Sequence, residues 1–378
     1  MSELINTRTA GTNFHRYLLT TVSALALLNS VNIHDAMAAD EDSDRPTIWI
    51  ELGGQLEHVD GQGEPFLPAF LAVNASSSIM TPTPPRQAQN PVPFEFGEEG
   101  RISFQPESSD WVFSAAARIG RSSNFKHVDH QTNRTHHSAI YSPPDITTIE
   151  KFADTQVHRR ESHAILDFAV GKDVGLGLFG RDGSSTLNFG VRFAQFAAKE
   201  MFDVRARPDL HFKYVSFAPG VPVPLFHTYH ATGSASRSFH GVGPSLSWNG
   251  SAPVIGNPQN GEMKFDWGAN ASILFGRQKA RAQHQESAHY MNLKYRAQEV
   301  YHTVYVHPPA GHTTARSVTV PNVGGFAGIS FQRGGAKVSL GYRADFFFGA
   351  MDGGIDKRKS ENVGFYGPFA TLSVGIGG

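Results

Sequence analysis

Single charged residues at alternate positions are the side chains of this sequence with the clearest chemical potential. They stand among small residues in stretches where every second residue is apolar. Because a β-strand turns successive side chains to opposite faces, these charges belong to the face opposite the apolar one. Facing a narrow aqueous interior, they would either select the ions that pass or pair across strands and fill that interior. The candidates are Glu51, Arg118, Asp167, Arg192, Asp266, Arg343 and Asp345.

Histidine is the second residue type that could do chemistry, with 18 in the chain, several of them in pairs. Two imidazoles a few residues apart bind zinc or copper when further ligands complete the site. The pairs lie in polar, loop-like segments without cysteine partners, so we predict no metal site. Capture of a metal or haem by these loops remains the alternative. The pairs are His127/His130, His136/His137, His227/His230 and His284/His289.

Enzymatic motifs are missing from the sequence. It has no G-x-S-x-G, H-E-x-x-H, phosphate-binding P-loop or G-x-G-x-x-G pattern. His163 and Asp167 share a predicted strand face, but four residues of strand separate them by about 13 Å. The sequence therefore predicts a protein that is not an enzyme and carries no cofactor.

The clearest secondary structure is a long hairpin within 336–376. Every second residue from Val338 to Phe348 is apolar, and the same holds from Pro368 to Ile376. The opposite faces carry small or charged residues. Each strand has about the ~9–11 residues that cross a bilayer as a tilted β-strand. An apolar outer face with a polar inner face is typical of a transmembrane barrel.

The same alternation recurs along the chain and predicts further strands at about 46–58, 94–105, 110–122, 158–171, 185–199, 236–250, 262–280 and 318–331. The strands are joined alternately by short turns at 106–109, 172–184, 251–261 and 333–335, and by longer polar loops at 60–93, 123–157, 200–235, 281–317 and 352–361. Short turns at one end and long loops at the other are typical of outer-membrane barrels. We predict an all-β, antiparallel up-and-down barrel of about ten strands, within a range of eight to twelve, over 46–378.

Composition narrows the classes of protein. The chain has no cysteine, which excludes disulfides, thiolate zinc sites and a lipid-modified cysteine. The formal net charge of −1 gives no basis for nucleic acid as a partner. Only 18% of residues are charged, and no apolar run approaches the ~18–20 residues of a transmembrane helix. A secreted β-sandwich remains open as an alternative, although its second face would be richer in Lys, Glu and Thr.

The amino-terminal segment resembles a secretory signal peptide. Arg8 and Arg16 precede an apolar stretch at 17–28, and Ala36-Met37-Ala38 offers an A-x-A cleavage site before Ala39. We therefore expect a signal peptide at 1–38, cleaved between Ala38 and Ala39, and a flexible leader at 39–45. An anchoring helix is the alternative, but the apolar core is short for one.

Several segments carry a family resemblance: GVGPSLSW (241–248), ASILFG (271–276), GGFAGISF (324–331), GYRADFFFGAMDGG (341–354) and YGPFATLSVG (366–375). They resemble the Legionella-type pore-forming major outer membrane protein family, over roughly the last half of the chain. The resemblance implies a porin-like β-barrel in a proteobacterial outer membrane.

The expected function is passive passage of ions and small hydrophilic solutes across that membrane. The expected partners are the outer-membrane lipid and these solutes, and the oligomeric state stays open. The alternative is a closed barrel that presents its loops for adhesion or for ligand capture.

Overall fold

The computed structural model describes residues 47–60, 95–137, 146–174, 184–207, 223–257, 260–293, 300–354 and 357–377. The expected signal peptide with Ala38 and Ala39, the leader and most of the loop at 60–93 lie outside the described residues. The described chain forms ten strands: β1 (Thr47–Asp60), β2 (Glu95–Gln105), β3 (Trp111–His137), β4 (Ile146–Asp173), β5 (Ser184–Arg207), β6 (Val223–Asn257), β7 (Gly261–Leu293), β8 (Val300–Arg333), β9 (Ala336–Asp352) and β10 (Ser360–Ile376).

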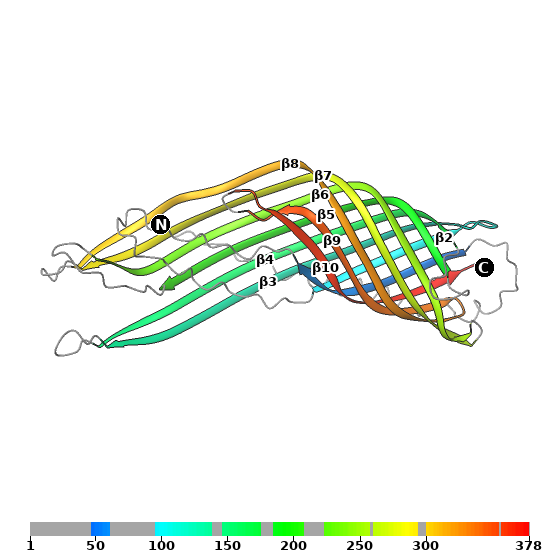
Figure 1. Ribbon diagram of the computed structural model, residues 1–378, viewed down its shortest axis with the longest axis horizontal. Helices are drawn as coiled ribbons and strands as arrows, with labels where there is room; N and C mark the ends of the chain where they lie inside the picture. The colour runs from blue at the N-terminus through cyan, green and yellow to red at the C-terminus, as the bar shows by residue number, and fades with distance from the viewer. Residues whose placement is uncertain are drawn as a thin grey trace, which may run out of the picture.

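The ten strands close into one antiparallel barrel. Each strand pairs with the strands next to it in sequence, and β1 closes the ring by pairing with β10. The predicted all-β, up-and-down barrel of about ten strands is therefore confirmed. Figure 1 shows the strands wound around the closed part of the barrel, at the right of the view. Within the described residues, no helix is long and apolar enough to cross a membrane.

The two faces of the barrel wall differ as the alternation predicts. Large apolar side chains point outward and are exposed; Phe168 is 52% exposed and Phe275 59%. Charged and polar side chains point inward and are buried, among them Arg192 at 5% and Asp345 at 0%. A soluble protein would bury the apolar face, whereas a barrel in lipid exposes it.

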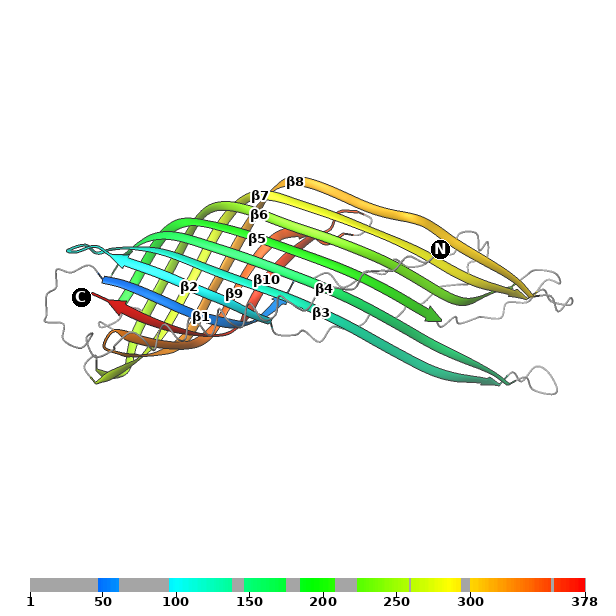
Figure 2. The same ribbon diagram turned by 180° about the vertical axis from the view of Figure 1, so that it is seen from behind.

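Six of the ten strands continue far beyond the closed barrel. β3 has 27 residues and β6 35, against 11 in β2 and 17 in β9. Pairing with β2 ends at Gly120, and pairing with β9 ends at Asn322. We call the six-stranded sheet beyond these points the extension: β3 from Arg121, β8 up to Pro321, and the parts of β4–β7 between them. Figures 1 and 2 show it curving away from the barrel.

The extension corrects the predicted loops at 123–157, 200–235 and 281–317. Strand structure continues in β3 to His137, in β5 to Arg207 and in β7 to Leu293, and the following strands begin at Ile146, Val223 and Val300. Apolar and polar residues do not alternate regularly in these segments, so the sequence pattern by which strands are recognised is lost there. Backbone pairing alone defines these strands, through registers such as Phe152↔Arg207 and Leu293↔Val300.

The hairpin of β9 and β10 turns inward at its tip. Gly349 adopts a positive φ of 68°, and its N–H donates to Asn362 Oδ1 at 2.9 Å. Pairing with β10 shifts register between Glu361 and Val363. Alternation then stops, because the successive residues Ala350, Met351 and Asp352 are all buried. Glycine suits this conformation, which L side chains rarely adopt. The tip thus lies against the interior of the barrel.

Candidate functional site: the barrel interior

Arg118 and Asp345 meet across the barrel. Arg118 Nη1 donates to Asp345 Oδ2 at 2.5 Å, with side-chain exposures of 12% and 0%. The two residues lie on β3 and β9, which are not neighbours in the sheet, so their contact crosses the interior. Five members of the candidate set are connected in this region, either directly or through shared partners.

Arg192 is the centre of this network. Its Nε and Nη2 donate to the two carboxylate oxygens of Asp167 at 2.6 and 3.0 Å. Its Nη1 donates to Asn270 Oδ1 at 2.8 Å and to Asn322 Oδ1, and lies 3.8 Å from Asp345 Oδ1. Asn270 Nδ2 donates in turn to Asp345 Oδ1 at 3.2 Å. A bidentate Arg–carboxylate pair is a strong and directional contact.

Arg343 closes the network on the other side. It pairs with Glu99 on β2, and its guanidinium carbon lies 4.7 Å from the Phe369 ring centroid. Gln55 Nε2 lies 3.3 Å from the backbone O of Arg343. Sequence reasoning missed Glu99, Asn270 and Asn322. All three lie on inward faces, so strand parity was the signal that would have found them.

The other two candidates lie apart, near the short-turn end. Asp266 Oδ2 lies 2.7 Å from Lys337 Nζ, and Asp266 Oδ1 accepts from Ser251 Oγ at 2.7 Å. Glu51 Oε2 accepts from Ser373 Oγ at 3.0 Å. All seven candidates thus face inward, and each has a partner, so none lines the interior as an isolated charge.

An apolar layer lies next to this network inside the barrel. The Phe196 ring on β5 lies 4.7 Å from Phe347 on β9 and 5.4 Å from Phe365 on β10, centroid to centroid. These rings therefore meet across the interior, since β5 lies opposite β9 and β10. The remaining buried members are Ile165, Ala194, Phe239, Leu274, Val320, Ala350, Met351 and Val363. The sequence analysis did not predict an apolar layer across the interior of the barrel.

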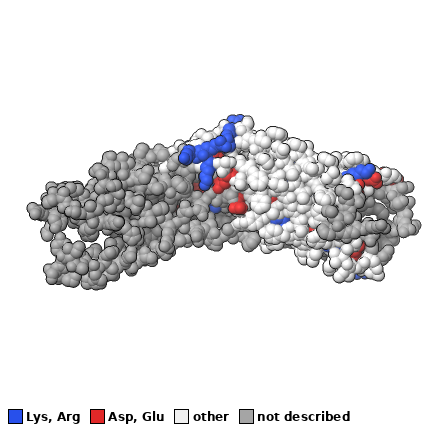
Figure 3. Space-filling model, viewed as in Figure 1, with Lys and Arg blue, Asp and Glu red and all other residues white. Residues whose placement is uncertain are grey.

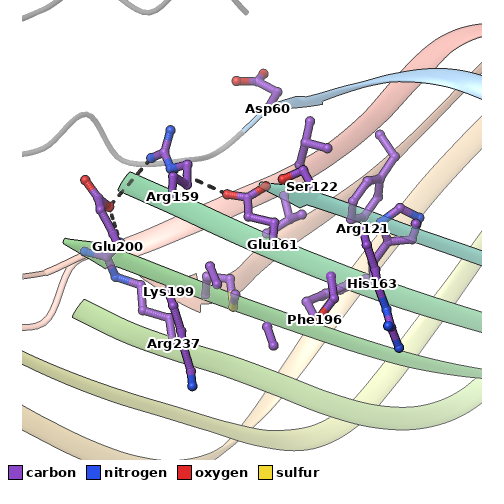
Figure 4. A pocket seen from close by; sticks show the side chains of 18 of the residues that line it. Asp60, Arg121, Ser122, Arg159, Glu161, His163, Phe196, Lys199, Glu200 and Arg237 are labelled. Carbon is purple, nitrogen blue, oxygen red and sulfur yellow. Dashed lines mark hydrogen bonds and ion pairs between the residues drawn. The ribbon is translucent and has the colours of Figure 1, made fainter. Parts of the chain in front are cut away.

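A pocket lies between the wall of β4 and β5 and the inturned hairpin tip (Figure 4). Its volume is about 40 Å³, and it is partly open to solvent. Glu200 Oε2 lies 3.4 Å from Arg237 Nη1 and 3.7 Å from Arg159 Nη2. Glu200 Oε1 and Arg237 Nε are buried without a hydrogen-bond partner among the described residues. Together with the Ser122 hydroxyl, which is also buried without a partner among the described residues, these atoms offer hydrogen-bonding groups to a polar occupant such as water.

Hydrogen bonds hold the hairpin tip in place. Asp352 Oδ2 accepts from Thr314 Oγ1 at 3.0 Å and lies 3.2 Å from His312 Nε2. Its Oδ1 accepts from the backbone N–H of Lys359 at 2.9 Å. Burial alone raises the pKa of Asp352, but these hydrogen bonds outweigh it and hold the pKa below its usual range. Arg237 Nη2 also donates to the backbone O of Gly353 at 3.1 Å.

The histidines do not assemble a metal site in the described part of the chain. No group of three His, Cys, Asp or Glu side chains there could hold a metal ion. His230 lies 3.3 Å from Asp203, and His284 also has partners. The other paired histidines, His127, His130, His136, His137, His227 and His289, have side chains outside the description.

His163 and Asp167 are not brought together. His163 Nε2 lies 3.2 Å from Glu57 Oε2, and its ring lies 4.1 Å from that of Phe365. Asp167 is instead bound to Arg192.

Comparisons with known proteins identify no family for this chain. No protein-family model matches the chain, and no curated protein matches it significantly. Among solved structures, the chain is similar to the ΔS2S3 mutant of TodX, a monoaromatic hydrocarbon channel. The two are 8% identical, the match covers 93% of this chain and 94% of that chain, and the TM-score is 0.20. The resemblance to the Legionella-type family stays a prediction.

Proposed function

We propose that this protein is an outer-membrane, porin-like channel for ions and small hydrophilic solutes. One observation carries the proposal: a closed barrel that exposes apolar side chains on its outer face while charged side chains face its interior. Lipid satisfies no backbone hydrogen bonds, so strands cross a bilayer only as a closed ring. In this proposal, residues 1–38 direct the chain across the inner membrane.

The charged network would then form the selective part of the channel. Arg118, Arg192 and Arg343 face Asp345, Asp167 and Glu99 within it. Rings of fixed charge decide which ions enter a narrow channel. A barrel of about eight strands is nearly filled by its own side chains, so ten strands leave little free width. Low conductance and marked ion preference are expected.

The apolar layer would control whether the channel conducts. Phe347 and Phe365 belong to the hairpin of β9 and β10, and they reach Phe196 on the opposite wall. A short apolar constriction excludes water and thereby stops ions. Conduction would follow displacement of the inturned tip, which Asp352 and Arg237 hold by hydrogen bonds.

Single-channel recording in planar bilayers tests the proposal. The purified protein should give stepwise currents that vanish after unfolding. Separate Arg118→Gln, Arg192→Gln and Arg343→Gln variants should change the reversal potential in a salt gradient. Arg333→Gln, which removes an exposed charge at a short turn, is the matched control and should leave it unchanged. Inserted protein that carries no current under any voltage contradicts the proposal.

A second function is a closed barrel that presents its extracellular loops for adhesion or ligand capture. The aromatic contacts across the interior favour it, because they fill space that a permanently open pore would keep clear. The recording separates the two: membrane insertion without current supports the closed barrel.

A further inference from the structure

The outer face of the barrel changes from apolar to basic within two residues along the strands. Register aligns Leu166, Phe193, Val242 and Phe275 across β4–β7 as an apolar row. Three further rows of outward-facing residues follow towards the extension, each two residues further along the strands. These rows contain Arg121 on β3, Arg160 on β4, Lys199 on β5, and Arg277, Lys279 and Arg281 on β7. We call these six residues the basic belt. The described residues of the three rows include no carboxylate.

The basic belt is densest on β7. Arg277, Lys279 and Arg281 follow one another on its outward face and are all exposed. Alternate residues of a strand lie about 6.6 Å apart, a spacing at which neighbouring cations repel. Figure 3 shows Lys and Arg gathered at the bend of the molecule, with Asp and Glu just below them and a broad, largely uncharged surface beside them. Such a group favours a partner that brings several negative charges.

The cations of the belt are available for such a partner. Within the part of the chain that the structure describes, its members on β3, β5 and β7 form no ion pair. Arg160 Nε lies 3.1 Å from His158 Nε2. The nearby carboxylate of Glu200 faces the interior and is bound to Arg159 and Arg237 there. Figure 4 shows Lys199 and Arg121 pointing away from those inward groups.

A groove on the outer face joins the belt to the apolar surface. It measures about 820 Å³ and is open to the outside. Leu166, Phe193 and Phe275 line its apolar side, while His240 and Arg277 line its polar side. An amphiphile placed here would lay its chain on the apolar side and its anionic head against the belt.

We propose that the basic belt binds the phosphate groups of the outer-leaflet lipid, the phosphorylated glycolipid of lipopolysaccharide. The inference rests on the membrane location proposed above. The belt adjoins the surface that would contact acyl chains, so a lipid reaches both surfaces at once and a soluble anion reaches only one. Each Lys or Arg near an anionic membrane surface strengthens binding about five-fold.

The test compares folded protein in detergent with diphosphorylated lipid A, with dephosphorylated lipid A and with inorganic phosphate. Native mass spectrometry counts the bound lipid, and the loss of β-sheet circular dichroism on heating measures protection. Arg277→Gln/Lys279→Gln/Arg281→Gln is the test variant. Lys172→Gln/Lys264→Gln/Arg333→Gln removes three cations from the short-turn end and serves as the matched control.

The wild type and the control should bind diphosphorylated lipid A alike, and the test variant about a hundred-fold more weakly. Equal binding by the test variant overturns the inference, as does equal binding of the dephosphorylated lipid. Equal protection by inorganic phosphate would identify a free-anion site and also overturns it. A protein that binds the lipid and inserts without current supports the belt and contradicts the pore, so the two proposals fail separately.

Discussion

Removing the charge of Asp345 should strongly destabilise the barrel. This carboxylate is fully buried, 2.5 Å from Arg118 and 3.8 Å from Arg192. At 2.5 Å and an effective dielectric constant of about 20, the attraction to Arg118 is about 7 kcal/mol before desolvation is subtracted. Asp345→Asn leaves Arg118 buried without this partner, whereas Arg192 keeps Asp167. We expect the free energy of unfolding to fall by about 3–5 kcal/mol, as for other broken buried pairs.

Equilibrium unfolding by urea in lipid vesicles, followed by tryptophan fluorescence, measures this loss. Arg118→Gln and the double variant Arg118→Gln/Asp345→Asn complete a double-mutant cycle. Because each single variant leaves one buried charge, the double variant should cost less than the sum of the two. Glu107→Gln, at an exposed turn, is the control and should change the free energy by under about 0.5 kcal/mol.

The result also reports on water in the interior. A pair in bulk water contributes only about 0–1 kcal/mol. Single variants that cost under about 1 kcal/mol, with additive effects, would refute the buried network and indicate a hydrated interior at this level.

Three further predictions concern the apolar layer, the wall and the hairpin tip. Phe196→Ala removes the ring that contacts β9 and β10, so single-channel recording should show a higher open probability than for the wild type. An unchanged open probability would contradict a gating role for the apolar layer. A Cβ at Gly276 would clash with the backbone O of His240, so Gly276→Ala should break the β6–β7 ladder and lower the yield of folded barrel on heat-modifiability gels. Gly334 has open space around it, so Gly334→Ala should fold and lower the free energy of unfolding by only about 1 kcal/mol. Because folding lowers the pKa of Asp352, its contribution to stability is complete above the ordinary pKa of 3.8 and disappears as the pH falls through the lower pKa of the folded state. The Asp352→Asn variant should therefore lack this loss of stability in an acid titration. An acid profile identical to that of the wild type would contradict this role of Asp352.

Alternation predicted the strands of the closed barrel, where apolar side chains are exposed on the outer face and polar side chains face the interior. Leu340 and Phe346 on β9 face outward as expected, and Arg343 and Asp345 face inward. The same rule failed from Arg121 onward in β3, because apolar and polar residues do not alternate regularly there. The ends of the long strands could therefore not be predicted from the alternation of apolar and polar residues, which is lost there.

The sequence predicted that the candidate side chains face the barrel interior, but not which partners they contact there. Each of the seven charges faces inward, as strand parity required. Their partners depend on barrel closure: Arg118 meets Asp345 only because β3 and β9 lie on facing walls. Phe196 occupies an inward position by the same parity as Arg192, so the apolar layer had a signal in the sequence. Its contact with Phe365 depends on barrel closure, which places β5 opposite β10 and which no local pattern indicates.

The ladder between β1 and β10 has a consequence for the order of folding. Every other strand pair joins neighbours in sequence, whereas this one joins Ile48 to Ile376. Contacts between such distant residues form slowly, since a long loop must close first. The hairpins can therefore assemble early, and the ring is sealed last. Until then β1 and β10 expose unpaired edges, which are liable to pair with other chains. Time-resolved measurements should detect most of the β-sheet before resistance to denaturation by detergent.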